Sequence, residues 1–186
     1  MRRNEEGEVR RYLDAGARLL WAGSPRQGIV LRGSDVFMIP FSLLWGGFAV
    51  FWEAMVLAGD APLFFALWGV PFVLMGLYIT IGRFWVDARA RSNTYYGLTD
   101  RRVVILDGLF TRSVTTLPLR TLHDISLTER SDRSGTIALG RSHPFAGFYE
   151  GMYWPGMGRF RSPGFEMIED AKRVHDQLIE AQREAA

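Results

Sequence analysis

Cysteine is absent from the 186-residue sequence, and histidine occurs only three times. The lack of cysteine excludes disulfides, thiolate metal sites and a cysteine nucleophile, and it suits a domain that faces a reducing cytoplasm. His123, His143 and His175 have no metal-ligand spacing and no cluster of carboxylates beside them. A P-loop, a GxSxG motif and a dinucleotide-binding glycine pattern are also missing. We therefore expect no catalytic residues, no metal site and no cofactor, and a protein that is not an enzyme.

An excess of charge of one sign is missing as well. The chain has 22 Lys and Arg against 20 Asp and Glu, which gives a formal net charge of +2. A balance this even does not favour nucleic acid as a partner. Residues 1–30 contain no uninterrupted apolar segment, so they lack the pattern of a cleavable signal peptide.

Charged residues are nearly absent between residues 36 and 82, where only Glu53 and Asp60 carry a charge. This region holds two apolar runs, 36–58 and 63–82, separated by the turn-like sequence GDAP. A helix rises about 1.5 Å per residue, so a run of about twenty residues crosses a hydrocarbon core of about 30 Å. The alternative, two helices buried in a soluble core, would need a larger chain to cover them. The pattern therefore predicts a transmembrane helical hairpin.

Basic residues indicate how this hairpin is oriented. They flank both apolar runs and are absent from the loop between the runs: Arg18, Arg26, Arg32, Arg83, Arg89 and Arg91. Cytoplasmic flanks of membrane helices carry an excess of Lys and Arg. We therefore expect a multi-pass protein of the cell inner membrane with both termini in the cytoplasm.

The sequence after the second apolar run changes to short apolar blocks that are typical of β-strands. These blocks are residues 92–99, 103–106, 113–119, 125–130 and 136–140. Asp107 and Gly108 lie between apolar blocks and predict a hairpin turn. Blocks of this length, with a turn every eight to twelve residues, predict a small antiparallel barrel or sandwich.

The last apolar pattern is that of a helix. Ser162 suits a helix cap and Pro163 the first turn, so we expect the helix to begin there. Its apolar stripe consists of Met167, Ala171, Val174, Leu178 and Ala181. Such a stripe would cover an open end of the sheet.

Three stretches together resemble the membrane-anchored bacterial pleckstrin-homology-like family. They are LLWAGSPRQG before the hairpin, YYGLTDRRVVILDGLFTRSVTTLPLRTLHDISL after it, and GTIALG. The resemblance covers about residues 18–182. It implies a bent antiparallel sheet of about seven strands capped by a C-terminal helix, with the first strand at 18–23 and the last at 157–161.

We therefore expect an α+β membrane protein in which a two-helix transmembrane hairpin is inserted into a small antiparallel PH-like β-barrel or sandwich. Residues 1–35 would form a cytoplasmic N-terminal segment with a short helix and the first strand. Residues 36–82 would form the hairpin. Residues 83–186 would form the cytoplasmic PH-like domain with its C-terminal helix.

Aromatic residues are concentrated in the glycine-rich stretch 144–160. Its rings either pack onto the barrel or form a recognition surface, because exposed aromatic side chains suit contact with a partner. The candidate partner-binding residues are Phe148, Tyr149, Tyr153 and Trp154. The leading hypothesis is a non-catalytic, membrane-tethered interaction module, either a scaffold or adaptor for a protein partner or a module that assembles into a homo-oligomer.

Arginines near the inner leaflet support an alternative function, the recognition of anionic lipid. The candidate contacts are Arg83, Arg89, Arg91, Arg101 and Arg102. Topology and ordinary strand solvation would also account for these residues. The resemblance gives no headgroup specificity, because pleckstrin-homology domains that bind inositol phosphates use a basic first loop, and the membrane hairpin occupies that position here.

Glu53 is the one acid that lies well inside an apolar run. Ionisable groups within membrane spans often serve transport or catalysis. Glu53 is also only five residues from the end of its span, where a carboxylate can reach the outer interface. Neither span contains a basic partner for it. A transport or enzymatic role centred on Glu53 is therefore the least favoured hypothesis.

Overall fold

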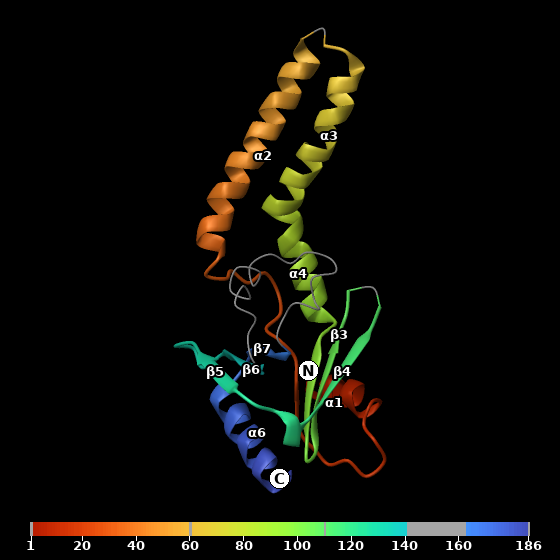
Figure 1. Ribbon diagram of the computed structural model, residues 1–186, viewed down its shortest axis with the longest axis vertical. Helices are drawn as coiled ribbons and strands as arrows, with labels where there is room; N and C mark the ends of the chain where they lie inside the picture. Colours follow the sequence, from red (N-terminus) through yellow and green to blue (C-terminus); the bar gives the residue numbers. More distant parts are fainter. Residues whose placement is uncertain (1, 60, 110, 141–162, 186) are drawn as a thin grey trace.

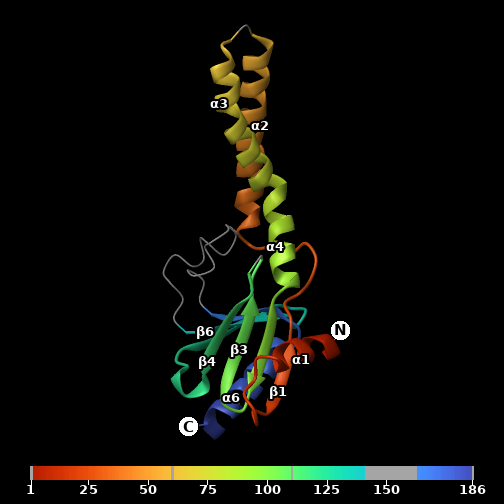
Figure 2. The ribbon, with the colours of Figure 1, turned by 90° about the vertical axis from the view of Figure 1, so that its right-hand side faces the viewer.

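The computed structural model describes residues 2–59, 61–109, 111–140 and 163–185. A long helical hairpin, formed by α2 and α3, extends from a smaller unit that contains all the described strands (Figure 1). Turning the molecule by 90° shows the same division, with α4 leading from the hairpin into the strands (Figure 2). The protein is therefore of the α+β class.

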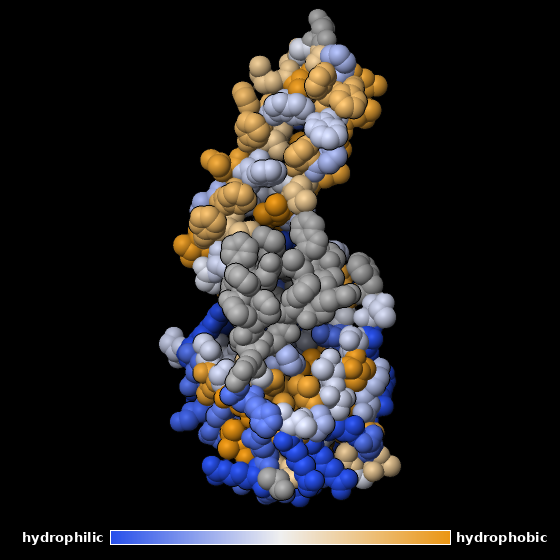
Figure 3. Space-filling model, viewed as in Figure 1, coloured by the Kyte–Doolittle hydropathy of each residue, from blue (hydrophilic) through white to orange (hydrophobic). Residues whose placement is uncertain are grey.

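The hairpin consists of two helices that are long and apolar enough to cross a membrane. The first is α2, Asp35–Ala58. The second is a 30-residue helix that runs through α3 (Leu63–Leu77), a π-helical turn (η1, Tyr78–Gly82) and α4 (Arg83–Ser92). Large apolar side chains are exposed along the hairpin, which appears mostly orange and pale in Figure 3 beside the bluer sheet unit. The predicted first run matches α2, whereas the second helix continues ten residues beyond the predicted end.

Small residues bring the two helices together. A Cβ added to Gly76 would lie 2.9 Å from the Cα of Gly46. The hydroxyl of Thr80 donates a hydrogen bond to the carbonyl of Ser42 at 3.3 Å. Small residues at such crossings allow close backbone approach, which is how apolar helices associate in lipid.

The first sheet contains strands from both sides of the hairpin. Its members, in sheet order, are β1 (Leu19–Gly23), β2 (Tyr95–Thr99), β3 (Arg102–Asp107) and β4 (Ser113–Pro118). All neighbours are antiparallel, and β1 pairs with β2 through Trp21 opposite Leu98 and Gly23 opposite Tyr96. The hairpin is thus an insertion between two adjacent strands of one sheet.

The second sheet is smaller and separate. A 3-10 turn, η2 (Leu119–Thr121), leads from the first sheet to β5 (Ile125–Glu129), β6 (Gly135–Leu139) and β7 (Gly164–Ile168). The order is β5-β6-β7, with antiparallel neighbours. The described residues contain seven strands, the number that the family resemblance implies. In the described part of the chain, however, they form two sheets of four and three strands rather than a closed barrel.

The C-terminal prediction requires a correction. Residues 164–168 are strand β7, and the helix α6 begins only at Ala171 and ends at Ala185. Met167 therefore belongs to β7 and not to the helix. The reason is tertiary pairing: β7 bonds to β6, with Phe165 opposite Ile137, and a Cβ on Gly164 would collide with the Ile137 carbonyl. The strand predicted at 157–161 lies outside the described residues.

The main core lies between the two sheets and α6. Phe165 is fully buried, with its ring centroid 5.2 Å from that of Trp21 and 5.1 Å from that of Tyr96. The predicted stripe of α6 is buried in the same core through Ala171, Val174, Leu178 and Ala181. The N-terminal helix α1, Arg2–Arg10, covers the other face of the first sheet, where Val9 packs on Val104 and Leu106.

Candidate functional site

The arginines predicted to contact lipid fall into two groups at opposite ends of the sheet unit. Strand β2 begins just after α4 and runs away from the hairpin, so the turn that carries Arg101 is at the far end (Figures 1 and 2). Helix α4 adds about 15 Å and a five-residue strand about 17 Å to this separation. Arg101 and Arg102 are therefore on the order of 30 Å from the base of the apolar hairpin, beyond a Debye length of about 8 Å.

Arg83, at the base of the hairpin, is buried in an ion pair. Its Nη1 lies 2.6 Å from Oδ1 of Asp35, and the two residues are each 4% exposed. Asp35 also accepts a hydrogen bond at 2.6 Å from the backbone N–H of Arg32. The first residue of α2 is thus tied to the first residue of α4.

Arg91 is buried in a second network centred on Asp87. Asp87 accepts from Arg91 Nε at 3.0 Å and from Arg32 Nη2 at 3.0 Å. Arg91 also donates to the carbonyls of Gly28, at 2.7 Å, and Arg26. Arg83 and Arg91 are therefore enclosed by protein groups, while Arg89 is the exposed arginine of α4.

Sequence reasoning did not identify Asp35 and Asp87 as part of this junction. The available signal was the spacing of Asp87 and Arg91, four residues apart on one helix. Asp35 also stands immediately before the first apolar run. Neither feature shows by itself that Asp35 pairs with Arg83, or that Asp87 pairs with Arg32.

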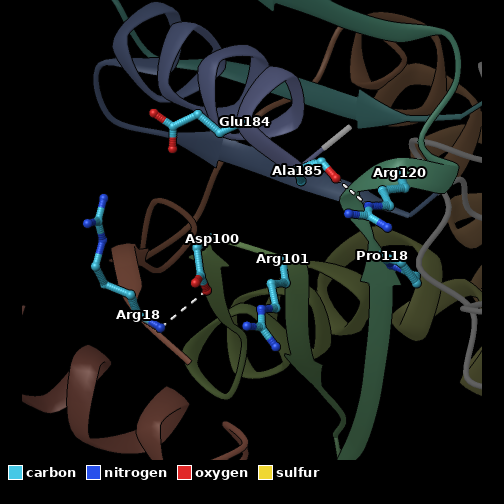
Figure 4. Close-up of a pocket in the computed structure, with 7 residues that line it drawn as sticks. All are labelled: Arg18, Asp100, Arg101, Pro118, Arg120, Glu184 and Ala185. Atoms are coloured by element: carbon cyan, nitrogen blue, oxygen red, sulfur yellow. Dashed lines mark hydrogen bonds between the residues drawn. The ribbon is translucent and has the colours of Figure 1, made fainter. Parts of the chain in front are cut away.

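The far end of the sheet contains a hollow of about 630 Å³. Its lining residues, drawn in Figure 4, are Arg18, Asp100, Arg101, Pro118, Arg120, Glu184 and Ala185. They come from the start of β1, the β2–β3 turn, the end of β4 with η2, and the end of α6. Four segments that are distant in the sequence thus meet around one open space, which has the size of an ordinary ligand pocket.

Backbone bonds fix one wall of this hollow. The Arg18 N–H donates to Oδ1 of Asp100 at 3.2 Å, and the Asp100 N–H donates to the Arg18 carbonyl at 3.1 Å. Thr99, fully buried, accepts from the N–H groups of Arg101 and Arg102 at 3.2 and 3.0 Å. The Arg101 carbonyl in turn accepts from the Leu119 N–H at 2.9 Å. The main chain that carries Arg18 and Arg101 is therefore held in place.

The wall formed by η2 and α6 is fixed in the same way. Gln182 donates to the carbonyls of Leu119 and Leu122 at 3.1 and 2.8 Å. Arg120 Nε donates to the carbonyl of Ala185, so a cation lies at the C-terminal end of the helix dipole. This contact uses one edge of the Arg120 guanidinium.

The remaining guanidinium groups of the hollow are open to solvent. Arg18 and Arg101 are exposed, and neither side chain makes a hydrogen bond or ion pair with any described residue. Figure 4 shows them on either side of Asp100, pointing in different directions. Arg102, by contrast, forms an ion pair with Asp14. The hollow thus offers unpaired planar cations, which suit carboxylate or phosphate groups.

A second depression lies at the foot of α2. This groove of about 350 Å³ is lined by residues 32–34 and by hydroxyl-bearing residues of β5 and β6, including Ser126, Thr128 and Thr136. Arg130, exposed and without a side-chain partner among the described residues, is also part of the lining. Because residues 32–34 lead directly into the apolar helix, the groove is close to the base of the hairpin.

Glu53 faces the partner helix. A Cβ on Gly69 would collide with the Glu53 carboxylate and with the ring of Trp52. The Oε2 atom is buried and has no hydrogen-bond partner in the described part of the chain. The carboxylate therefore points toward α3, and no described group completes a proton relay with it.

The other predicted sites are not brought together. Phe148, Tyr149, Tyr153 and Trp154 lie outside the described residues. The described ranges contain no group of three metal-ligating side chains. His123 and His175 are in different segments, one after η2 and one on α6.

Two ionisable groups outside the hairpin have shifted pKa values. Hydrogen bonds from the Ser134 hydroxyl and N–H, together with the nearby Arg26, lower the pKa of Asp132. Contacts with Tyr12 and Glu8 raise the pKa of Arg112. Both groups hold surface segments together, and neither belongs to the hollow or the groove.

Comparison with known proteins gives one relation. A family model described as "Bacterial PH domain" matches residues 41–182. No curated protein and no solved structure matches. The family match confirms the resemblance seen in the sequence. It begins within α2, so it does not include β1, which the structure places in the same sheet as β2.

Proposed function

The chain belongs to the bacterial PH domain family, and we propose that it is a non-catalytic interaction module tethered to the cytoplasmic face of the inner membrane. In this proposal α2 and α3 cross the bilayer, α4 leads from the membrane to the strands, and the two-sheet unit presents a binding surface to a protein partner or to further copies of the chain. Members of such a family generally bind rather than catalyse.

The observation that carries this proposal is the position of the hairpin within the sheet. Strands β1 and β2 are hydrogen-bonded neighbours, yet the whole hairpin lies between them in the sequence. Pairing of β1 with β2 therefore requires the chain to enter and leave the hairpin at the same end, next to the sheet. Apolar side chains are exposed along both helices, such as Val36 at 81% on α2 and Leu63 at 73% on α3, and they need a lipid environment.

The buried ion pairs at the base strengthen this proposal. The Arg83–Asp35 pair joins α4 to α2. The Asp87 network joins α4 to Arg32, in the segment before α2. A module that binds partners at a membrane benefits from such a rigid base, because a fixed orientation reduces the entropy lost on binding. The positive residues at the base and the lack of basic residues in the loop support cytoplasmic termini.

The membrane part of the proposal has a direct test. We expect the full chain to sediment with membranes on ultracentrifugation without detergent, and we expect protease added to intact cells to leave its C-terminal half uncut. Recovery of the chain in the supernatant, or external digestion of the C-terminal half, would show that the topology is wrong.

The interaction part is tested by crosslinking in native membranes followed by recovery of the chain. We expect a specific crosslinked partner, and we expect Trp154→Ala combined with Tyr153→Ala to reduce its recovery at normal expression and insertion. Tyr12→Ala, an aromatic change on a different segment, serves as the control. Equal recovery from the double variant and the control would argue against the 144–160 surface.

Anionic-lipid recognition is a second candidate, and the groove at the foot of α2 favours it. Arg130, the Ser and Thr hydroxyls and residues 32–34 line a polar space next to the apolar helix, where a lipid phosphate would lie. Of the five arginines predicted to contact lipid, Arg89 is the one that is both exposed and close to the hairpin.

The lipid candidate predicts that the chain released from mixed micelles retains phosphatidylglycerol more often than phosphatidylcholine in native mass spectrometry. Arg130→Gln should lower this preference, whereas Arg173→Gln, on the exposed face of α6, should not. Equal retention of both lipids by the unmodified chain would exclude selective recognition.

A role for Glu53 in transport has less support, because its buried carboxylate oxygen has no described partner along which a proton could pass. We expect Glu53→Gln to leave insertion and partner recovery unchanged. A loss of either in this variant would reopen the hypothesis.

A further inference from the structure

We propose that the hollow formed by Arg18, Arg101 and Arg120 is a docking site for an acidic segment of a cytoplasmic protein. This inference rests on the proposed interaction function and names the chemistry of the partner. The hollow shares no lining residue with the groove at the foot of α2.

Arginines outnumber acids in the lining of the hollow, which has Arg18, Arg101 and Arg120 against Asp100 and Glu184. Arg18 and Arg101 are exposed arginines whose side chains have no partner among the described residues. Asp100, the acid between them, already accepts a hydrogen bond from the Arg18 backbone. Most other arginines near the described acids are paired: Arg32, Arg83, Arg91, Arg102 and Arg112 all have carboxylate partners. Other arginines, such as Arg89 and Arg130, are also open, but Arg18 and Arg101 share one hollow.

The walls of the hollow are held by hydrogen bonds within the chain, so the site is already formed before a ligand binds. Thr99 fixes the turn that carries Arg101, paired backbone bonds fix Arg18, and the bond to Ala185 fixes Arg120. Binding would then immobilise the outer side-chain atoms but no backbone. Sites held in this way lose less entropy when a ligand binds.

The directions of the open arginines favour an extended ligand. Arg18 and Arg101 point in different directions on either side of Asp100 (Figure 4), and Pro118 and Ala185 add apolar lining. Guanidinium groups that point apart are not placed to close around one compact phosphate, and Asp100 and Glu184 repel any anion that lies next to them. An extended peptide advances about 3.3 Å per residue, so carboxylates spaced along it can reach each arginine separately.

Position excludes the leaflet as the source of the anion. The hollow is at the end of the sheet opposite the hairpin, on the order of 30 Å away along α4 and β2. Lipid headgroups are therefore out of contact range, and a soluble segment in the cytoplasm is not.

The test uses the full chain in nanodiscs of phosphatidylcholine, which present no anionic lipid, and a fluorescein-labelled hexaglutamate peptide as the probe. We expect the anisotropy of the peptide to rise on binding and the affinity to fall with added salt. Arg18→Gln combined with Arg101→Gln should weaken binding by about tenfold or more, because charge-assisted hydrogen bonds are lost.

Two matched variants separate the site from general charge. Lys172→Gln combined with Arg173→Gln removes the same two charges from the exposed face of α6 and should bind the peptide like the unmodified chain. Glu184→Gln removes an acid from the lining and should tighten binding. All variants should keep the circular dichroism spectrum of the unmodified chain.

Three results of the peptide experiment would overturn the proposal. They are no binding at low salt, equal weakening in the two double variants, and tighter binding of tripolyphosphate than of the peptide, which would assign the hollow to compact phosphates. If crosslinking in native membranes recovers a partner equally well from Arg18→Gln/Arg101→Gln, the interaction function stands and this site is wrong. If the unmodified chain recovers no partner, the interaction function itself fails.

Discussion

Two buried arginines at the base of the hairpin differ in their surroundings from the open arginines at the opposite end of the sheet. Arg83 and Arg91 are buried and bonded to Asp35 and Asp87, whereas Arg101 is exposed and has no described side-chain partner. Burying a guanidinium costs free energy unless its hydrogen-bonding groups are satisfied. A basic stretch next to a membrane span can therefore serve internal structure, since two of the three arginines of α4, Arg83 and Arg91, are buried in ion pairs and Arg89 is the exposed one.

The cause is the different demand on each region. At the base, two helices, a loop and a sheet converge, so polar groups there are removed from water and must bond to one another. At the far end, the converging segments leave an open hollow, and water reaches the side chains of Arg18 and Arg101. Charge at the base therefore fixes geometry, and charge at the far end remains available for binding.

Breaking the Arg83–Asp35 pair should have the largest effect. In Arg83→Leu the carboxylate of Asp35, 4% exposed, loses its ion-pair partner. We expect the free energy of unfolding to fall by about 3–5 kcal/mol, since a buried charge is left uncompensated. This corresponds to a fall on the order of 10 °C in the thermal midpoint, measured by circular dichroism in detergent.

The matched control for this prediction replaces both partners. Arg83→Leu combined with Asp35→Leu removes the uncompensated charge, and such apolar replacements of buried pairs are often neutral. We expect the double variant to regain most of the lost stability. If the single and double variants are equally unstable, the pair itself is not the cause.

Replacement of Arg91 by lysine should have a smaller effect. Lysine keeps the charge and can still pair with Asp87, but one ammonium group cannot also reach the carbonyls of Arg26 and Gly28. We expect a loss of about 1–2 kcal/mol in the free energy of unfolding, measured by denaturant titration in detergent. Arg89→Lys, on the exposed face of the same helix, should change nothing measurable. Equal losses at both positions would contradict the distinction between buried and exposed arginines.

The helical hairpin and most strands could be predicted from sequence, because their signals are local. An apolar run of membrane length and a short apolar block between turns each show in a few consecutive residues. The prediction for the first helix, 36–58, agrees with Asp35–Ala58, and 103–106 lies within β3. The buried stripe of α6 was also visible, since its period of 3.6 does not depend on the rest of the fold.

The features that sequence reasoning missed depend on distant contacts. Residues 164–168 follow a Ser-Pro pair that suits a helix start, but pairing with β6 makes them a strand. The hollow combines residue 18 with residues 100–101, 118–120 and 184–185, and no local pattern connects these segments. Sequence likewise does not show whether an arginine is buried in an ion pair or left exposed, because this depends on which acid the fold brings next to it.

Removal of the open arginines Arg18 and Arg101 should leave stability unchanged, in contrast to removal of the buried Arg83. Arg18→Gln combined with Arg101→Gln deletes no described side-chain contact. We expect the free energy of unfolding to stay within about 0.5 kcal/mol of the unmodified value, as for most surface substitutions. Thermal denaturation of this variant beside Arg83→Leu provides the measurement. A loss as large as that of Arg83→Leu would show that the exposed arginines are structural too.

Arg26 and Asp132 form an intermediate case, a paired arginine that is exposed, and should give the smallest effect. They lie 3.0 Å apart with more than 45% of each side chain exposed. The pKa of Asp132 is lowered from its ordinary 3.8, first by the Ser134 hydroxyl. Its contribution to stability is therefore present above the ordinary pKa and is lost as pH falls through the lowered value. We expect the difference in thermal midpoint between the unmodified chain and Asp132→Asn to be small at neutral pH and to vanish in acid, whereas Glu129→Gln, exposed on β5, should show no such pH-dependent difference. A difference that persists unchanged in acid would mean that Asp132 acts through its shape in the turn and not through its charge.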